Sequence, residues 1–144
     1  MNRRRIALLL ATLVLALAPA GAVRASSSPV VIDFEKSCPA FTCEETAASP
    51  VDVATAITSG WLSGSVFHYT ATETLSSANG SVTLDLVGVL VLNRVPNLTV
   101  LHGTVTSGSW DGVDLAGAEV YASAVRVGGS TFAGFVQIMP ASAG

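Results

Sequence analysis

The stretch Val66–Leu75, which reads VFHYTATETL, decides the fold because its side chains alternate in character. One face carries the apolar residues Phe67, Tyr69, Ala71 and Leu75, and the other carries the polar residues His68, Thr70, Thr72 and Thr74. A period of two is typical of a strand with one face in an apolar core. We therefore predict a half-buried strand here.

Similar patterns lie on both sides of this stretch. Val82–Leu92 (VTLDLVGVLVL) alternates as well, but its second half is apolar on both faces. We expect that half to be covered on both sides. Thr99–Thr106 (TVLHGTVT) places His102 among threonines on one face. Two further strands are predicted at Val30–Phe34 and Ser130–Met139.

Two segments of the chain contain similar short motifs in the same order, which suggests an internal repeat. The matching segments are AITSGW at 56–61 with TVTSGSW at 104–110, LSGS at 62–65 with LAGA at 115–118, and VGVLVL at 87–92 with AGFVQI at 133–138. The alanines of Asp114–Val127 are compatible with a helix. However, the segment aligns with the threonine-rich Val66–Leu75, so we predict a strand. The repeats span about 51–92 and 99–139, unless the similarity arose by chance.

Two three-stranded repeats and an N-terminal strand give about seven antiparallel strands. A small closed barrel or a sandwich covers the edges of such a sheet. We predict a single all-β domain over residues 26–144 with one of these architectures. Trp61 and Trp110 each follow a Ser-Gly turn and are predicted to close the ends of the core. Gly88 and Gly134 lie in mid-strand, where glycine suits bends or bulges.

The first 25 residues have the layout of a secretory signal peptide. Arg3, Arg4 and Arg5 precede the apolar stretch Ile6–Ala18, and Ala25 offers a small residue at the cleavage position. The apolar stretch is shorter than the roughly 20 residues that a membrane-spanning helix needs. We predict a Sec-type signal cleaved after Ala25, a secreted or extracytoplasmic protein, and no membrane span in the mature form.

Cys38 and Cys43 both lie in the predicted mature chain, within the predicted loop Glu35–Pro50. An exported protein meets an oxidising compartment, where such a pair becomes a disulfide. The spacing C-x4-C differs from the redox motif C-x-x-C, and no second pair of ligands follows at zinc-site spacing. We predict a structural disulfide, with free thiols or a catalytic pair as the alternatives.

Charge and motifs exclude several classes of function. Four of the seven Lys and Arg residues lie in the predicted signal peptide, which leaves three basic against ten acidic residues, a net charge of −7. Such a surface repels phosphate backbones, so we predict no nucleic-acid partner. The sequence contains no phosphate-binding loop, nucleophile elbow, zinc-protease motif or calcium-binding EF-hand loop. We therefore predict no cofactor and no metal.

Five residues form a candidate site for a ligand or for proton transfer. His68 and His102 lie on threonine-bearing strand faces, and Asp85 lies on the polar half of a third strand. If these strands are neighbours, the three side chains could converge for proton transfer or weak metal binding. The alternative is an ordinary solvated strand face. Tyr69 and Tyr121 could line a cavity together with a histidine.

Some motifs of the chain resemble those of a known group of proteins. The opening Asp33-Phe34-Glu35 with Cys38-Pro39, and the later stretch HGTVTSG at 102–108, are similar to small exported proteins of actinobacteria whose function is undescribed. This resemblance implies a β-rich exported domain of bacterial origin and no catalytic residues. The strand count is also similar to that of barrels of the allene oxide cyclase and dirigent type.

These observations together favour a small, exported, non-enzymatic β-domain. We expect it to bind a small molecule or a component of the cell envelope, at an open barrel end or an exposed strand face. The alternatives are a cofactor-free barrel enzyme of isomerase or cyclase type and a structural envelope protein that associates through sheet edges. A cavity of ~300 Å³ or more that contains His68 or His102 would favour a carrier or an enzyme.

Overall fold

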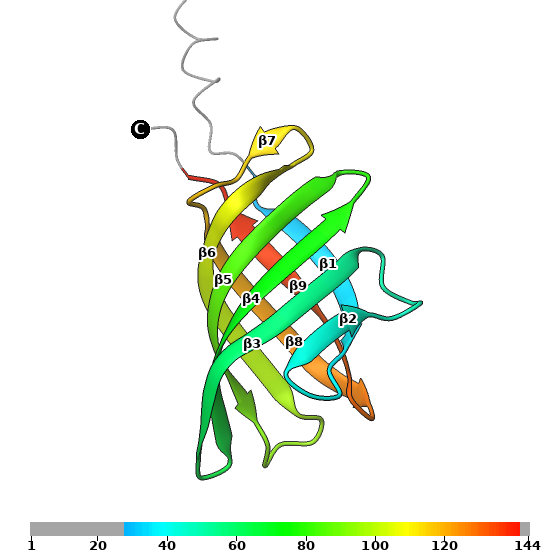
Figure 1. Ribbon diagram of the computed structural model, residues 1–144, viewed down its shortest axis with the longest axis vertical. Helices are drawn as coiled ribbons and strands as arrows, with labels where there is room; N and C mark the ends of the chain where they lie inside the picture. The colour runs from blue at the N-terminus through cyan, green and yellow to red at the C-terminus, as the bar shows by residue number, and fades with distance from the viewer. Residues whose placement is uncertain (1–27, 142–144) are drawn as a thin grey trace, which may run out of the picture. The chain divides into compact units, whose positions relative to one another are not determined.

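The computed structural model describes residues 28–141, and this part of the chain contains nine β-strands and no helix (Figure 1). The predicted signal peptide lies outside the described residues. No helix within residues 28–141 is long and apolar enough to cross a membrane. The strands are β1 (Val30–Ser37), β2 (Thr42–Glu45), β3 (Asp52–Ser63), β4 (Val66–Ser77), β5 (Gly80–Val91), β6 (Leu98–Trp110), β7 (Val113–Asp114), β8 (Glu119–Gly128) and β9 (Thr131–Met139).

Eight of the strands close into an antiparallel barrel in the order β1-β2-β3-β4-β5-β6-β8-β9, and β9 pairs with β1. The short β7 pairs with the end of β6. The prediction of an all-β domain is confirmed, and the sheet is a closed barrel with slightly more strands than expected. The shortest strand pairing in the barrel is that of β1 with β2, which share only the pairs Lys36↔Glu45 and Ser37↔Glu44.

Two predicted boundaries were wrong. The predicted loop 35–50 contains the end of β1 and all of β2, because this short strand fills the gap between β1 and β3. The predicted strand at 114–127 begins only at Glu119, because residues 115–118 form a turn in which Gly117 has a φ of 82°. The remainder of that segment is a strand, as its alignment with Val66–Leu75 predicted.

The two ends of the barrel differ in their connections (Figure 1). We call the end with the β4–β5 turn and the β6–β7–β8 connections the upper end, and the end with the β3–β4, β5–β6 and β8–β9 turns the lower end. The upper half is filled by fully buried apolar side chains, namely Leu75, Val82, Leu84, Val105, Leu115, Val120 and Ile138. Burial of this surface supplies the main driving force for folding.

Strand alternation sets which side chains enter this core. The apolar face predicted for β4 is the inner face, where Tyr69, Ala71 and Leu75 are buried. The double cover expected for the second half of β5 is only partial, since on the outer face Val87 is 49% exposed while Val89 and Val91 are half-buried. A closed barrel of one sheet buries only its inner face.

Trp61 and Trp110 occupy opposite sides of the sheet, with exposures of 59% and 7%. In β3 the pairing with β4 shifts between Ile57 and Ser59, so Thr58 is an extra residue. A bulge of one residue exchanges the faces of everything that follows it. Trp61 therefore lies outside, stacked on His68 with the ring centroids 5.0 Å apart. The prediction that it closes the core was wrong.

Trp110 belongs to the core, as predicted. Strand β6 also contains an extra residue, Thr106, opposite the step from Thr83 to Leu84 of β5. One more residue then separates Gly108 from the tryptophan than separates Gly60 from Trp61. Because of this additional residue, Ser109, the side chain of Trp110 points into the barrel.

Gly88 and Gly134 lie in regularly paired stretches of β5 and β9 and not in bulges. A Cβ atom at Gly134 would collide with the backbone of Ser123 and Ala124 on β8, and one at Gly88 would collide with Leu101 on β6. These glycines therefore allow close contact between neighbouring strands.

Candidate functional site

A cavity of about 170 Å³ occupies the lower half of the barrel interior. Its walls come from all eight strands of the barrel and from the loop between β1 and β2, and most of the side chains are apolar. The lining residues are Lys36, Cys38, Ala40, Phe41, Cys43, Thr55, Ile57, Phe67, Tyr69, Ala71, Glu73, Leu86, Leu90, Thr99, Leu101, Arg126 and Phe132. The volume is below the ~300 Å³ typical of sites for drug-sized ligands.

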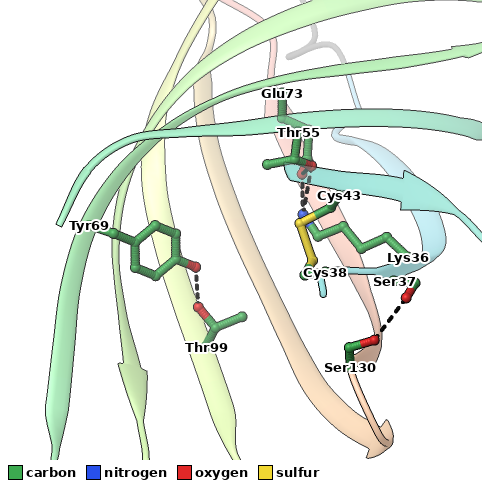
Figure 2. Close-up of a disulfide and its surroundings, with 9 residues drawn as sticks. All are labelled: Lys36, Ser37, Cys38, Cys43, Thr55, Tyr69, Glu73, Thr99 and Ser130. Atoms are coloured by element: carbon green, nitrogen blue, oxygen red, sulfur yellow. Dashed lines mark hydrogen bonds and ion pairs between the residues drawn. A yellow bond between two sulfur atoms is a disulfide. The ribbon is translucent and has the colours of Figure 1, made fainter. Parts of the chain in front are cut away.

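A buried polar cluster forms one wall of this cavity. Figure 2 shows Lys36 of β1 extending to Thr55 of β3 and Glu73 of β4. The Lys36 ammonium forms an ion pair with Glu73 Oε2 and donates to Thr55 Oγ1 at 3.2 Å. Thr55 Oγ1 in turn donates to Glu73 Oε2 at 2.6 Å. Glu73 is 1% exposed and Lys36 8%, so each charge depends on the other for compensation.

Tyr69 of β4 and Thr99 of β6 form a second polar pair in the lining of the cavity, drawn apart from the Lys36–Glu73 pair in Figure 2. The Thr99 hydroxyl donates to the Val89 carbonyl at 3.0 Å, so it accepts from the Tyr69 phenol. Burial raises the pKa of Tyr69 to about 12, opposed by the Thr99 hydrogen bond and reinforced by the Glu73 carboxylate. The phenol is therefore neutral near physiological pH and acts as a hydrogen-bonding group.

The disulfide Cys38–Cys43 lies at the lower end and confirms the prediction for these two cysteines (Figure 2). It closes the loop that contributes Ala40 and the exposed Phe41 to the lining of the cavity. The backbone N–H of Cys38 donates to the Ser130 carbonyl at 2.8 Å, which joins this loop to the β8–β9 turn. The disulfide thus holds the rim of the cavity.

The structure brings four of the five predicted site residues to one hollow of about 350 Å³, namely His68, Tyr69, His102 and Tyr121. The side chains of His68, His102 and Tyr121 are on the outer face of the sheet, whereas Tyr69 is on the inner face and also lines the interior cavity. Asp85, on the outer face of β5, lines a neighbouring hollow together with His102. His102 and Tyr121 are direct partners across β6 and β8.

The outer residues lack the contacts of a developed acid–base or metal site. Asp85 accepts a long hydrogen bond of 3.4 Å from Thr72, and no hydrogen bond within residues 28–141 joins it to His68 or His102. In the same part of the chain, no three His, Cys, Asp or Glu side chains are grouped so that they could hold a metal ion. A role for these residues in ligand binding or proton transfer stays a prediction.

The sequence interpretation missed five polar residues of the cavity lining, namely Lys36, Thr55, Glu73, Thr99 and Arg126. A signal for two of them was present. Lys36 follows Phe34 by two positions in β1, and Glu73 lies between Ala71 and Leu75 on the apolar face of β4. A charged residue in step with an apolar face must enter the core, where it needs a partner.

Comparison of the chain with protein-family models, curated proteins and solved structures gives no match. The chemistry of the site is therefore defined by the side chains that line it.

Proposed function

We propose that this protein is an exported small-molecule-binding barrel whose ligand occupies the lower cavity. The observation that carries the proposal is a cavity with mostly apolar walls and two polar pairs, Lys36–Glu73 and Tyr69–Thr99. Ligand sites commonly combine an apolar lining with a few placed polar groups that set orientation and specificity.

The cavity volume limits the size of the ligand. An engineered apolar cavity of about 150 Å³ binds benzene, so about 170 Å³ suits one ring or a short branched chain with a small substituent. Phe67, Leu90 and Leu101 supply apolar surface for such a body. Each Å² of apolar surface removed from water contributes roughly 25 cal/mol to binding before the entropy lost on association is subtracted.

Two observations support a location outside the cytoplasm. The sequence begins with a predicted signal peptide, and the disulfide Cys38–Cys43 is compatible with an oxidising compartment. A carrier of small apolar molecules is useful in such a compartment, because these compounds dissolve poorly in water.

A cofactor-free enzyme is less well supported than a binding protein. A general base acts best when its pKa lies near the working pH, whereas the pKa of Tyr69 is raised to about 12. Glu73 is engaged by both Lys36 and Thr55. Association through sheet edges would have to use the seam at β2, because β1 and β3 are paired on this side only at residues 36–37 and 54–56, while the other long strands are paired on both sides.

Binding in the cavity can be tested by NMR on the exported, signal-free protein. Phenol, indole and benzoate are titrated separately while the backbone amide signals are followed. We expect at least one compound to shift the signals of cavity residues and leave those around the outer hollow unchanged. Shifts confined to the outer hollow, or no shifts with a wider set of small compounds, would contradict the proposal.

A pair of matched variants separates cavity binding from surface adsorption. Ala71→Leu adds bulk inside the cavity, while Ala54→Leu adds the same bulk on the exposed face of β3. We expect Ala71→Leu to abolish binding and Ala54→Leu to retain it. Unfolding curves of both variants show whether each one is folded, and Thr99→Val provides a second cavity variant if Ala71→Leu is not.

A further inference from the structure

The net charge of the cavity lining is opposite in sign to the net charge of the rest of the protein. All three cations and all ten carboxylates of the predicted mature chain lie within residues 28–141. Two of the three cations, Lys36 and Arg126, line the cavity, but only one of the ten carboxylates, that of Glu73, does so. The lining therefore carries one net positive charge on a protein that is otherwise strongly acidic.

Arg126 is the uncompensated charge of this set. The pair Lys36–Glu73 is the only ion pair within the described part of the chain, so the Arg126 guanidinium has no carboxylate partner there. It lies over the ring of Phe132, 5.5 Å from the centroid, and Phe132 also lines the cavity. Stacking on an aromatic ring holds the guanidinium in place while leaving its edge free for hydrogen bonds.

The third cation lies at the same end of the barrel. The backbone N–H of Arg126 donates to the Asn97 carbonyl at 2.9 Å, so the end of β8 adjoins the β5–β6 loop that contains Arg94. By contrast, the upper end carries Asp111, Asp114 and Glu119 in and around the β6–β7–β8 connections. All three cations of the described chain therefore lie at the lower end, so an approaching anion is repelled less there than at the upper end.

Three other carboxylates, those of Glu35, Glu44 and Glu45, lie on β1 and β2 near the lower end. Two of them already have partners: Glu35 accepts from the Thr46 hydroxyl at 2.6 Å, and Glu45 accepts from the backbone N–H of Val53 at 3.1 Å. None of the three lines the cavity. They outnumber Arg94 and Arg126 at this end, so attraction of an anion depends on direct contact with the Arg126 guanidinium, with which none of them forms an ion pair.

We infer that the ligand of this cavity is a compact apolar monoanion, of the class of small aromatic or branched-chain carboxylates. The inference rests on the proposed function and specifies its ligand. The apolar body would fill the space beside Phe67, Leu90 and Leu101, and the carboxylate would accept two parallel hydrogen bonds from Arg126 at the rim. An amine of the same shape would meet two cations and a carboxylate already paired with Lys36.

The test compares benzoate, benzyl alcohol and benzylamine, which share a ring and differ mainly in charge. Each is titrated by NMR into the exported protein at low and high salt. We expect benzoate to bind about tenfold more tightly than benzyl alcohol, as one charge-assisted contact supplies. Benzylamine should bind most weakly, and the preference for benzoate should shrink at high salt, because ions screen exposed charges.

Substitutions of the two exposed arginines show which residue causes the preference for benzoate. Arg126→Gln should weaken benzoate binding about tenfold and leave benzyl alcohol unchanged, because only the anion uses the guanidinium. Arg94→Gln removes the same charge from the neighbouring loop, outside the cavity lining, and should have a much smaller effect. Arg126→Lys should restore only part of the loss, because an ammonium cannot make the two-pronged contact.

The outcomes separate the ligand class from the proposed function. If benzyl alcohol binds in the cavity as tightly as benzoate, or if Arg126→Gln weakens both equally, the inference is overturned and the binding function stands. If neither compound shifts any cavity signal in the wild-type protein, and wider screening also fails, the binding function itself falls.

Discussion

The two halves of the barrel interior follow the same rule of alternation but are filled differently. In the upper half the inward positions hold apolar residues such as Leu75, Leu84 and Ile138, which exclude solvent completely. In the lower half they include Lys36 and Glu73, and a cavity remains. The difference shows that alternation determines which side chains enter the barrel, while the residue types at those positions determine whether they leave space.

The largest effect is expected from Glu73→Gln, which removes the charge that compensates Lys36. An uncompensated ammonium in the interior should lower the free energy of unfolding by about 3–5 kcal/mol. Urea denaturation measures this loss. The double variant Lys36→Met with Glu73→Leu should recover most of it, because apolar residues of similar volume replace both charges. A loss below about 1 kcal/mol in Glu73→Gln would show that solvent already reaches the pair.

Leucine truncations test the contrast between a filled and a hollow half. Leu84→Ala in the upper half should lower the free energy of unfolding by about 3 kcal/mol, because it opens a void in packed surroundings. Leu90→Ala should cost less, since this residue already borders the cavity and is only partly buried. Equal losses in chemical denaturation would contradict the difference in packing between the halves.

The phenol of Tyr69 predicts a dependence of stability on alkaline pH. Its pKa is raised to about 12, against 10.0 for an ordinary tyrosine, so the folded chain holds the proton more tightly than the unfolded chain. This contribution is fully present below pH 10.0 and is lost as the pH rises towards 12. The free energy of unfolding should fall by about 2 kcal/mol over this window.

Two tyrosine variants assign that alkaline loss. Tyr69→Phe removes the buried hydroxyl and should flatten the profile between pH 10 and pH 12. Tyr121→Phe changes a half-exposed ring on the outer face and should keep the fall seen in the wild-type protein. A profile for Tyr69→Phe that still falls like the wild type would assign the loss to other groups.

A loss of stability of similar size, but confined to one region, is expected at the rim of the cavity. Replacing Cys38 and Cys43 by serine together should lower the free energy of unfolding by about 2 kcal/mol, because the disulfide closes only a short loop. Amide hydrogen exchange should then become faster in β1, β2 and the β8–β9 turn and stay slow in the upper half. Uniformly faster exchange would show that the disulfide stabilises the whole barrel instead of its lower rim.

Much of the fold was predictable from local patterns. Alternation identified β4, β5 and most of β6, since each of these strands buries one face, and strand-favouring residues identified β9. Closure was not predictable, because the pairings of β1 with β9 and of β5 with β6 join strands whose local sequence specifies no partner. The strand β2 was hidden as well, because its four residues are too few to show a period.

The site was less predictable than the fold. Tyr69 was identified, and the inward positions of Lys36 and Glu73 could have been read from the same alternation. The outward orientation of Trp61 could not be read from the sequence, because the bulge at Thr58 lies in a stretch without a clear period. The predicted internal repeat stays a proposal, which gains support because β3 and β6 bulge at the matched residues Thr58 and Thr106.

The pairing of the first strand with the last one affects how the barrel can form. Strands β1 and β9 share eight residue pairs, from Val30↔Ile138 to Ser37↔Thr131, across nearly the full length of the described chain. Contacts so distant in sequence form slowly, since the intervening chain must first be brought together. During synthesis, β1 emerges early and cannot pair with β9 until β9 has emerged as well. The ring can therefore close only when the whole chain has emerged, so a chain arrested before β9 would expose the edge of β1.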